Sequence, residues 1–287
     1  MSNRTLVIGA SGNIGGEVVD QLSATGNHVR AMTRNPALTS FPQGVEIVQG
    51  DITLPETLEG PLNGIDSVFL VWTAGPDTIA PVVQRIARSA RRIVLLTSPH
   101  KTQHPFFQQP NKLRGLHQAL ETQIEASGME WTILRPGMLA RNTRSWWAPQ
   151  IRKGNVVRWP LLNAPTAPIH ERDIAAVAIH ALLEDTHTGA EYVLTGPQSL
   201  TQAEQVLEIG RALSRPLLVE EISPDEARQE LLAIMPPFII EMLLAAWSAA
   251  IGQPAYVTAT VKEITGLQPR TLFDWATDHK QELLDGA

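Results

Sequence analysis

The chain has 287 residues, of which 43% are hydrophobic and 18% are charged, and its net charge is −6. This length and composition suit one large α/β domain with a substantial hydrophobic core. We expect no nucleic-acid partner, because affinity for a phosphate backbone requires clustered Lys and Arg, and no basic cluster is present. The absence of cysteine excludes disulfides, thiolate chemistry and cysteine-based metal sites.

The N-terminus lacks the charged and then apolar pattern of a signal peptide. The very apolar segment 231–250 is broken by Pro236 and Pro237 and contains Glu241, so its uninterrupted part is too short to span a bilayer. We therefore expect a cytoplasmic protein without a membrane partner. Its expected partners are a small-molecule substrate and, at most, a second copy of the chain in a homodimer.

The first predicted element is an apolar strand at 6–10, which leads through a glycine turn into a helix. Gly9, Gly12 and Gly15 have the spacing Gly-x-x-Gly-x-x-Gly at the start of a helical pattern over 14–24. A strand, turn and helix of this kind direct backbone N–H groups at a phosphate. The first glycine permits the turn, the second lets a pyrophosphate approach, and the third lets helix and strand pack closely. The pattern predicts a dinucleotide site; the alternative is a purely structural turn.

Arg34 follows the second predicted strand, 29–33, and we expect it to select the nucleotide. An NAD site usually has Asp or Glu about 20 residues after the glycines, but no acidic residue occurs from Gln21 to Gly44. A guanidinium can hold a 2′-phosphate through two parallel hydrogen bonds. We therefore predict NADP(H) as the cofactor. The alternative is a solvated arginine on a loop.

Strands and helices alternate along the chain, which predicts an α/β fold with a Rossmann-type, doubly wound parallel sheet. The expected strands are 6–10, 29–33, 45–49, 67–72, 93–98, 131–135 and 191–195. The expected helices are 14–24, 79–90, 112–126, 172–183, 203–212 and 224–233, with further helices after Pro237, the first from 238 to about 251. We expect one NAD(P)-binding domain over 1–287. Its Rossmann core would comprise 1–139 and 164–196, and a smaller, mostly helical C-terminal lobe facing the substrate would comprise 140–163 and 197–287, its helices after Thr201 having no strand partner.

Ligands of such sheets bind beyond the carboxyl ends of the strands, so the residues after each strand form the predicted cofactor site. These residues are Gly9, Ala10, Ser11, Gly12, Asn13, Ile14, Gly15, Thr33, Arg34, Asp51, Ile52, Trp72, Thr73, Ala74, Thr97, Ser98, Pro136 and Gly137. The Pro- and Trp-rich stretch 142–168 is interpreted as a wall for a flat apolar substrate, or alternatively as core packing or a subunit interface. The predicted substrate-binding residues are His100, Met138, Trp146 and Trp147. No metal site is expected, because His100 and His104 share no helical face.

Several motifs together resemble the atypical, NmrA-like branch of the short-chain dehydrogenase/reductase superfamily. They are 9–15 (Gly-Ala-Ser-Gly-Asn-Ile-Gly), 33–36 (Thr-Arg-Asn-Pro), 50–51 (Gly-Asp) and 130–137 (Glu-Trp-Thr-Ile-Leu-Arg-Pro-Gly). Later segments are most similar to the ergot-alkaloid reductase subgroup (agroclavine dehydrogenase and festuclavine synthase), with NADPH-dependent quinone oxidoreductases a close second. The resemblance implies an NADP-dependent oxidoreductase of secondary metabolism.

The superfamily's usual general acid is a Tyr four residues before a Lys. The resemblance places the Lys position at His117 and the Tyr position at Leu113, and the chain's tyrosines are Tyr192 and Tyr256. Ketone reduction needs a proton donor as hydride arrives, whereas hydride addition to an iminium ion gives a neutral amine directly. Reduced quinones also need less help, because conjugation stabilises the anion.

We therefore predict an NADPH-dependent reductase that transfers hydride to a C=N (iminium) or conjugated bond of a small apolar metabolite, without the usual Tyr general acid. His117 and Ser98 are the candidate catalytic residues. Two alternatives stay open: an NADP(H)-binding redox sensor or regulatory protein without catalysis, and a quinone or carbonyl reductase.

Overall fold

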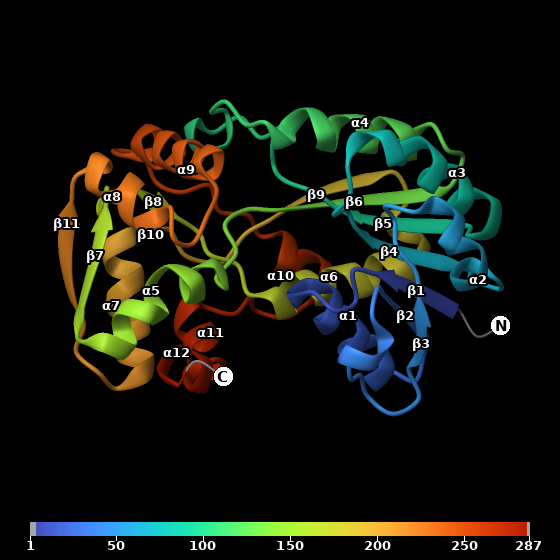
Figure 1. Cartoon of the computed structure of the whole chain (residues 1–287), viewed down its shortest axis with the longest axis horizontal. Helices are drawn as coiled ribbons and strands as arrows, with labels where there is room; N and C mark the ends of the chain where they lie inside the picture. Colours follow the sequence, from blue (N-terminus) through green and yellow to red (C-terminus); the bar gives the residue numbers. More distant parts are fainter. Residues whose placement is uncertain (1–3, 286–287) are drawn as a thin grey trace. The chain divides into compact units, whose positions relative to one another are not determined.

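The computed structural model describes residues 4–285, which form two compact units (Figure 1). The first unit comprises the chain up to Ser98, Leu113–Pro136 and Glu171–Tyr192. The second comprises Pro99–Lys112, Gly137–His170 and the chain from Val193 onward. The outer limits of the predicted domain, 1 and 287, lie outside the described residues, and the predicted boundary between core and lobe stays a prediction.

The first unit is built on a seven-stranded sheet with the order β3-β2-β1-β4-β5-β6-β9. The strands are β1 (Arg4–Ile8), β2 (His28–Thr33), β3 (Glu46–Gln49), β4 (Ser67–Val71), β5 (Arg92–Leu96), β6 (Glu130–Pro136) and β9 (Ala190–Leu194). Neighbouring strands from β3 to β6 run parallel. Continuous apolar runs such as those of β4 and β5 suit strands that are covered on both faces. The predicted Rossmann-type sheet is confirmed, with strand limits that differ by one or two residues.

Helices cover both faces of this sheet, as Figure 1 shows. The pair α1 (Asn13–Ala24) and α6 (Glu171–Leu183) pack against each other, as do α3 (Ile79–Ser89) and α4 (Leu113–Glu125). Short helices complete the unit: η1 (Pro36–Leu38), η2 (Pro55–Leu58), α2 (Glu59–Leu62), η3 (Pro76–Thr78) and η5 (Asp185–His187). Because the strands from β3 to β6 run parallel, their carboxyl ends lie at one edge of the sheet, with a glycine turn at the end of β1.

The second unit is mostly helical, as predicted. Its helices are η4 (Pro105–Phe107), α5 (Asn142–Lys153), α7 (Gln202–Leu213), α8 (Pro224–Leu231), α9 (Pro237–Ala250), α10 (Thr260–Thr265), α11 (Leu272–Asp278) and α12 (Lys280–Leu284). The expectation that helices after Thr201 have no strand partner was wrong. Strand β11 (Leu218–Ile222) pairs in parallel with β7 (Val156–Pro160), and β10 (Leu200–Thr201) pairs with β8 (Pro165–Thr166). These strands are short, and each pairs with a segment far away in the sequence.

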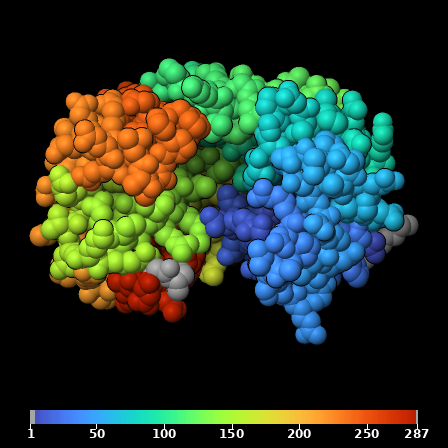
Figure 2. Space-filling view, in the orientation of Figure 1, coloured from blue at the N-terminus to red at the C-terminus, as the bar shows by residue number. Residues whose placement is uncertain are grey.

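Four indole rings form the centre of the second unit's core. Trp146, Trp147, Trp159 and Trp247 pack with ring centroids 5.5–6.2 Å apart, and all are buried. Figure 2 shows the orange surface of α8 and α9 lying against the yellow-green surface of α5 and β7. Trp146 and Trp147 belong to α5, Trp159 to β7 and Trp247 to α9. Much of the Trp-rich stretch that was interpreted as a substrate wall therefore packs inside this unit.

A capping box begins α11 and makes the second unit's stability depend on pH. The Asp274 carboxylate accepts hydrogen bonds from the Thr271 backbone N–H (2.8 Å) and hydroxyl (2.7 Å). The hydrogen bond from the Thr271 hydroxyl, together with the one from its backbone N–H, holds the pKa of Asp274 below its usual value. A lowered folded-state pKa stabilises the fold above the unfolded pKa of about 3.9, and this contribution is lost as the pH falls through the folded-state value.

We expect Thr271→Val to lower the free energy of unfolding by about 1 kcal/mol at neutral pH, since it removes an N-cap. The difference between wild type and variant should shrink as the pH falls below about 4, because protonation of Asp274, complete only below its lowered folded-state pKa, removes the pH-dependent part of the wild type's advantage. Urea titrations at several pH values measure it. Thr277→Val is the matched control, because the Thr277 hydroxyl donates only to the Phe273 carbonyl on the same helix. A gap between wild type and T271V that stays constant down to pH 3 would contradict the assignment.

Candidate coenzyme site and active site

The glycine turn after β1 has the geometry that a phosphate requires. Gly9 has φ +89°, and the Gly12 N–H donates to its carbonyl at 3.0 Å. A Cβ on Gly15 would lie 2.1 Å from the Gly9 carbonyl oxygen, so only glycine fits there. Helix α1 begins after Gly12 with no side-chain cap and no acidic residue in its first turn. Its first N–H groups and positive dipole end can therefore receive a phosphate.

We expect Gly15→Ala to weaken NADPH binding at least about tenfold, because the added methyl group displaces α1 from the turn that aligns its N–H groups. Isothermal titration calorimetry measures the change. Gly16→Ala is the matched control, since a Cβ at Gly16 has its nearest neighbour at 3.5 Å, an ordinary contact. Equal affinities for G15A and G16A would show that the close approach is unimportant for binding.

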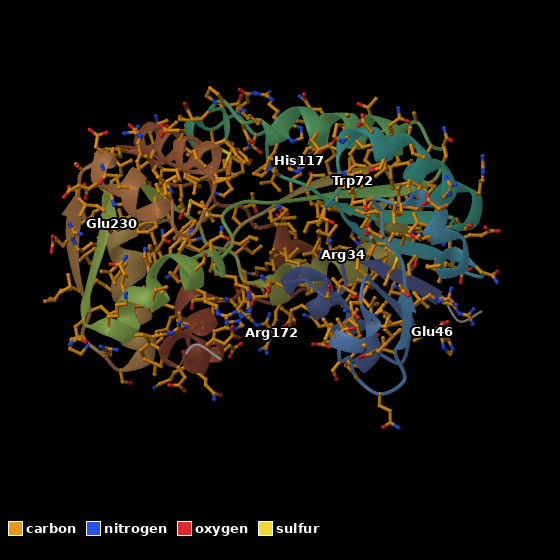
Figure 3. All side chains as sticks on the ribbon, in the orientation of Figure 1. Arg34, Glu46, Trp72, His117, Arg172 and Glu230 are labelled. Carbon is orange, nitrogen blue, oxygen red and sulfur yellow. The ribbon has the colours of Figure 1, made fainter. Side chains whose placement is uncertain are left out.

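A cavity of about 240 Å³ lies at the carboxyl ends of the first four strands. It is lined by Ile8, Gly9, Ser11, Gly12, Met32, Thr33, Arg34, Gly50, Asp51, Ile52, Val71 and Thr73. The strand order reverses between β1 and β4, and open α/β sheets bind their ligands at such a point. Figure 3 shows Arg34 and Trp72 at this edge and Glu46 at the opposite edge. The structure thus brings together eight of the predicted cofactor residues in one cavity.

Arg34 is exposed at the rim of this cavity, and among the described residues its guanidinium has no hydrogen-bond or ion-pair partner. Asp51, the one acidic residue that lines the cavity, is already engaged. Its Oδ1 accepts from the backbone N–H and the hydroxyl of Thr53, both at 2.8 Å. The Arg34 guanidinium is therefore available to a 2′-phosphate, whereas the Asp51 carboxylate is hydrogen-bonded within its own loop.

The other predicted cofactor residues surround this cavity or lie at neighbouring strand ends. Ala10, Asn13, Ile14 and Gly15 belong to the glycine turn and the first turn of α1; Trp72 and Ala74 follow β4; Thr97 and Ser98 follow β5; Pro136 ends β6. The Trp72 indole donates to the Ala74 carbonyl at 2.8 Å and fixes that turn. Sequence reasoning missed Ile8, Met32 and Val71, each of which directly precedes a predicted residue.

Ser98 and His117 form a hydrogen-bonded pair in the first unit. The Ser98 Oγ lies 2.7 Å from His117 Nδ1, and both side chains are half-buried. Ser98 follows β5, where the Thr97 N–H donates to the Leu134 carbonyl of β6. His117 lies one turn into α4 (Figure 3). A hydroxyl and an imidazole in contact can orient each other and move a proton.

The two tyrosines lie elsewhere in the chain. Tyr192 is on β9, where its hydroxyl lies 2.9 Å from His187 Nδ1, and burial raises the pKa of the Tyr192 phenol. Tyr256 follows α9 in the second unit and is exposed. Leu113, which the resemblance places at the Tyr position, is the first residue of α4.

The second unit has a small pocket of about 10 Å³ that includes two of the predicted residues, Gly137 and Met138. It is lined by His104, Phe106, Phe107, Gly137, Met138, Pro165, Thr166, Ala167, Thr195, Ala255 and Tyr256. The other predicted substrate residues are not part of it. His100 and Trp147 are buried, and Trp146 borders a separate cavity of about 290 Å³.

No helix of the described residues 4–285 is both long and apolar enough to cross a membrane. No group of three or more His, Asp or Glu residues in that part of the chain could hold a metal ion.

Comparisons with known proteins agree with this geometry. A family model described as NAD(P)H-binding matches residues 9–185, more than half of the chain. The chain is 38% identical over 283 residues to the (4-alkanoyl-5-oxo-2,5-dihydrofuran-3-yl)methyl phosphate reductase of Streptomyces griseus, covering 96% of this chain and 98% of the relative. It is 30% identical over 284 residues to the NAD(P)H azoreductase of Xenophilus azovorans, covering 96% and 97%.

Among solved structures, the NADPH-dependent quinone oxidoreductase of Escherichia coli has the same fold, with a TM-score of 0.78 at 21% identity over 96% of this chain and 98% of that one. The glycine turn, the cavity at the strand ends and the family match lead to one conclusion. The chain belongs to the NAD(P)H-binding family, as a member of the atypical, NmrA-like short-chain dehydrogenases/reductases, and is an NADP(H)-dependent oxidoreductase.

Proposed function

We propose that this reductase transfers hydride from NADPH to a conjugated C=C or a C=N bond of a small apolar metabolite, without a Tyr general acid. The observation that carries the proposal is the 2.7 Å contact between Ser98 Oγ and His117 Nδ1 at the end of β5. In this chain the pair would take the place of the superfamily's Tyr and Lys. The further cofactor and substrate roles predicted from the sequence belong to the same proposal.

The bound coenzyme supplies the hydride, and the chain supplies position and a proton. Hydride addition to a conjugated C=C bond leaves an enolate, which must be protonated. In the proposed relay the Ser98 hydroxyl gives its proton to the substrate, and a His117 imidazolium returns a proton from Nδ1 to the Ser98 oxygen. His117 is then a neutral imidazole and takes up a proton from solvent before the next turnover. An iminium substrate becomes a neutral amine on hydride addition and needs no such step.

Two of the relatives favour electron-poor, conjugated acceptors. The name of the S. griseus relative describes a dihydrofuran ring whose C=C bond is conjugated with the 5-oxo and the alkanoyl carbonyl groups. The X. azovorans relative is named for azo reduction. Both acceptors stabilise the negative charge that hydride brings, which favours hydride transfer to them.

We assign substrate binding to the second unit's pocket, which has an aromatic wall. Phe107 contacts Phe106 edge-on, with ring centroids 5.1 Å apart, and lies 6.4 Å from the ring of Tyr256. The Phe106 N–H donates to His104 Nδ1, and His104 Nε2 lies 3.1 Å from the Pro254 carbonyl oxygen, so this imidazole connects two loops. Because the pocket is only water-sized in this structure, a flat substrate would enter by moving these rings apart.

NADPH oxidation against a substrate panel tests the proposal. The panel contains butenolides and other enones, cyclic imines, quinones and azo dyes, with unconjugated ketones as the matched control. We expect turnover with conjugated or iminium acceptors and none with simple ketones. Turnover with simple ketones alone, or with no class although NADPH binds, would contradict the proposal.

A further inference from the structure

A buried ion-pair network centred on Arg135 lies next to Ser98. The Arg135 guanidinium on β6 forms two parallel hydrogen bonds with the Glu121 carboxylate of α4, at 2.5 and 2.9 Å, and both side chains are only 2% exposed. Arg135 also donates to Glu191 of β9 at 2.8 Å. Planar, two-point pairing of this kind fixes orientation as well as distance.

This network contacts both segments that hold the pair. Glu121 lies four residues after His117 on α4, so the two side chains share one face of the helix. Ser98 follows β5, which pairs with β6 in the register Leu96 to Leu134, and Arg135 Nη1 lies 3.5 Å from the Ser98 carbonyl oxygen. One guanidinium is thus in contact with the loop of the hydroxyl and with the helix of the imidazole.

Stability does not require an ion pair at this place. Removing two charges from water is costly, and well-packed apolar residues of similar volume are often as stabilising or more so. Apolar residues, however, would not fix how α4 is rotated about its axis relative to the end of β5. The Ser98–His117 contact depends on that rotation, because a turn of the helix would carry the imidazole away from the hydroxyl.

We infer that Arg135 is a positioning residue for the Ser98–His117 pair, and this inference rests on the proposed function. Arg135 holds Glu121 and the Ser98 loop in one register, so that the hydroxyl and the imidazole stay in contact. It touches neither substrate nor coenzyme in this role.

Arg135→Met combined with Glu121→Met tests the inference. The double variant removes both fully buried charges, and Glu191, which also loses Arg135, is 34% exposed, so the protein should fold. We expect kcat with an enone to fall about 10- to 100-fold, as small misplacements do, with KM and the Kd for NADPH unchanged. The imidazole ¹⁵N signal of His117 should lose the shift that marks its hydrogen bond. Arg135→Lys, which keeps the charge but not the two-point pairing, should recover only part of kcat.

Arg92→Met is the matched control. Arg92 is as buried as Arg135, and it likewise donates to a carboxylate, Glu130, and to two backbone carbonyls. It lies at the start of β5, however, at the amino ends of the strands and away from Ser98. This variant should lose stability without changing kcat or the His117 signal. An unchanged His117 signal in R135M/E121M, or an equal change in R92M, would overturn the inference. Full activity of Ser98→Ala and His117→Ala would instead refute the proposed function, and the imidazole signal would still test the role of Arg135.

Discussion

Replacing Arg34 with Glu is expected to raise the Kd for NADPH about 100- to 1,000-fold while changing the Kd for NADH less than about threefold. Charge-assisted hydrogen bonds contribute about 1.5–3 kcal/mol each, and 1.4 kcal/mol is a factor of ten in affinity. The variant loses such bonds to the 2′-phosphate and adds repulsion between two anions. NADH has no 2′-phosphate, so it loses neither interaction. Calorimetric titration of both coenzymes measures the two effects.

Two further variants make this test specific. Arg88→Glu makes the same charge change in the last turn of α3, and it should leave both affinities unaltered. Arg34→Lys keeps the charge but presents a single point donor, so it should weaken NADPH binding less than the Glu variant does. Equal losses for NADPH and NADH in R34E would show that Arg34 acts on the shape of the site and not on the phosphate.

The sheet and its coenzyme edge could be predicted from the sequence because their causes are local. The β-branched run of β1, the glycine turn and the first turn of α1 lie within a few residues of one another, and Gly15 is required by a contact with Gly9. Parallel strands place all their carboxyl ends at one edge, so strand positions alone predict which loops meet there. This is why most of the residues that line the cavity could be predicted from the sequence.

The second unit could not be predicted in this way, because its arrangement depends on distant contacts. Strand β7 pairs with β11 some sixty residues later, from Val156 with Leu218 to Pro160 with Ile222. The tryptophans of α5 suit a ligand wall and a core equally well by composition, and their packing against Trp159 and Trp247 depends on segments that are distant in the sequence. Ser98 and His117 were both predicted, but their contact depends on how α4 packs against β6 and next to the segment that follows β5.

That contact leads to the second large effect. We expect His117→Ala and Ser98→Ala each to lower kcat about 100- to 10,000-fold with a conjugated enone, the range typical of a lost acid or base. The Kd for NADPH should change far less than kcat, because neither side chain lines the cavity at the carboxyl ends of the first four strands. The double variant should lose little more than either single one, since two groups of one relay act as a unit. Single-turnover measurements separate the chemical step from binding.

The nature of the acceptor distinguishes a proton relay from a merely structural pair. A cyclic iminium ion needs hydride but no proton, so H117A and S98A should reduce it at nearly the wild-type rate, whereas an enone needs both. His28→Ala, an exposed histidine at the start of β2, is the control and should leave both rates intact. If the two variants slow iminium and enone reduction equally, the pair shapes the site and transfers no proton. If they slow only enone reduction, the proton that completes the reaction passes through Ser98.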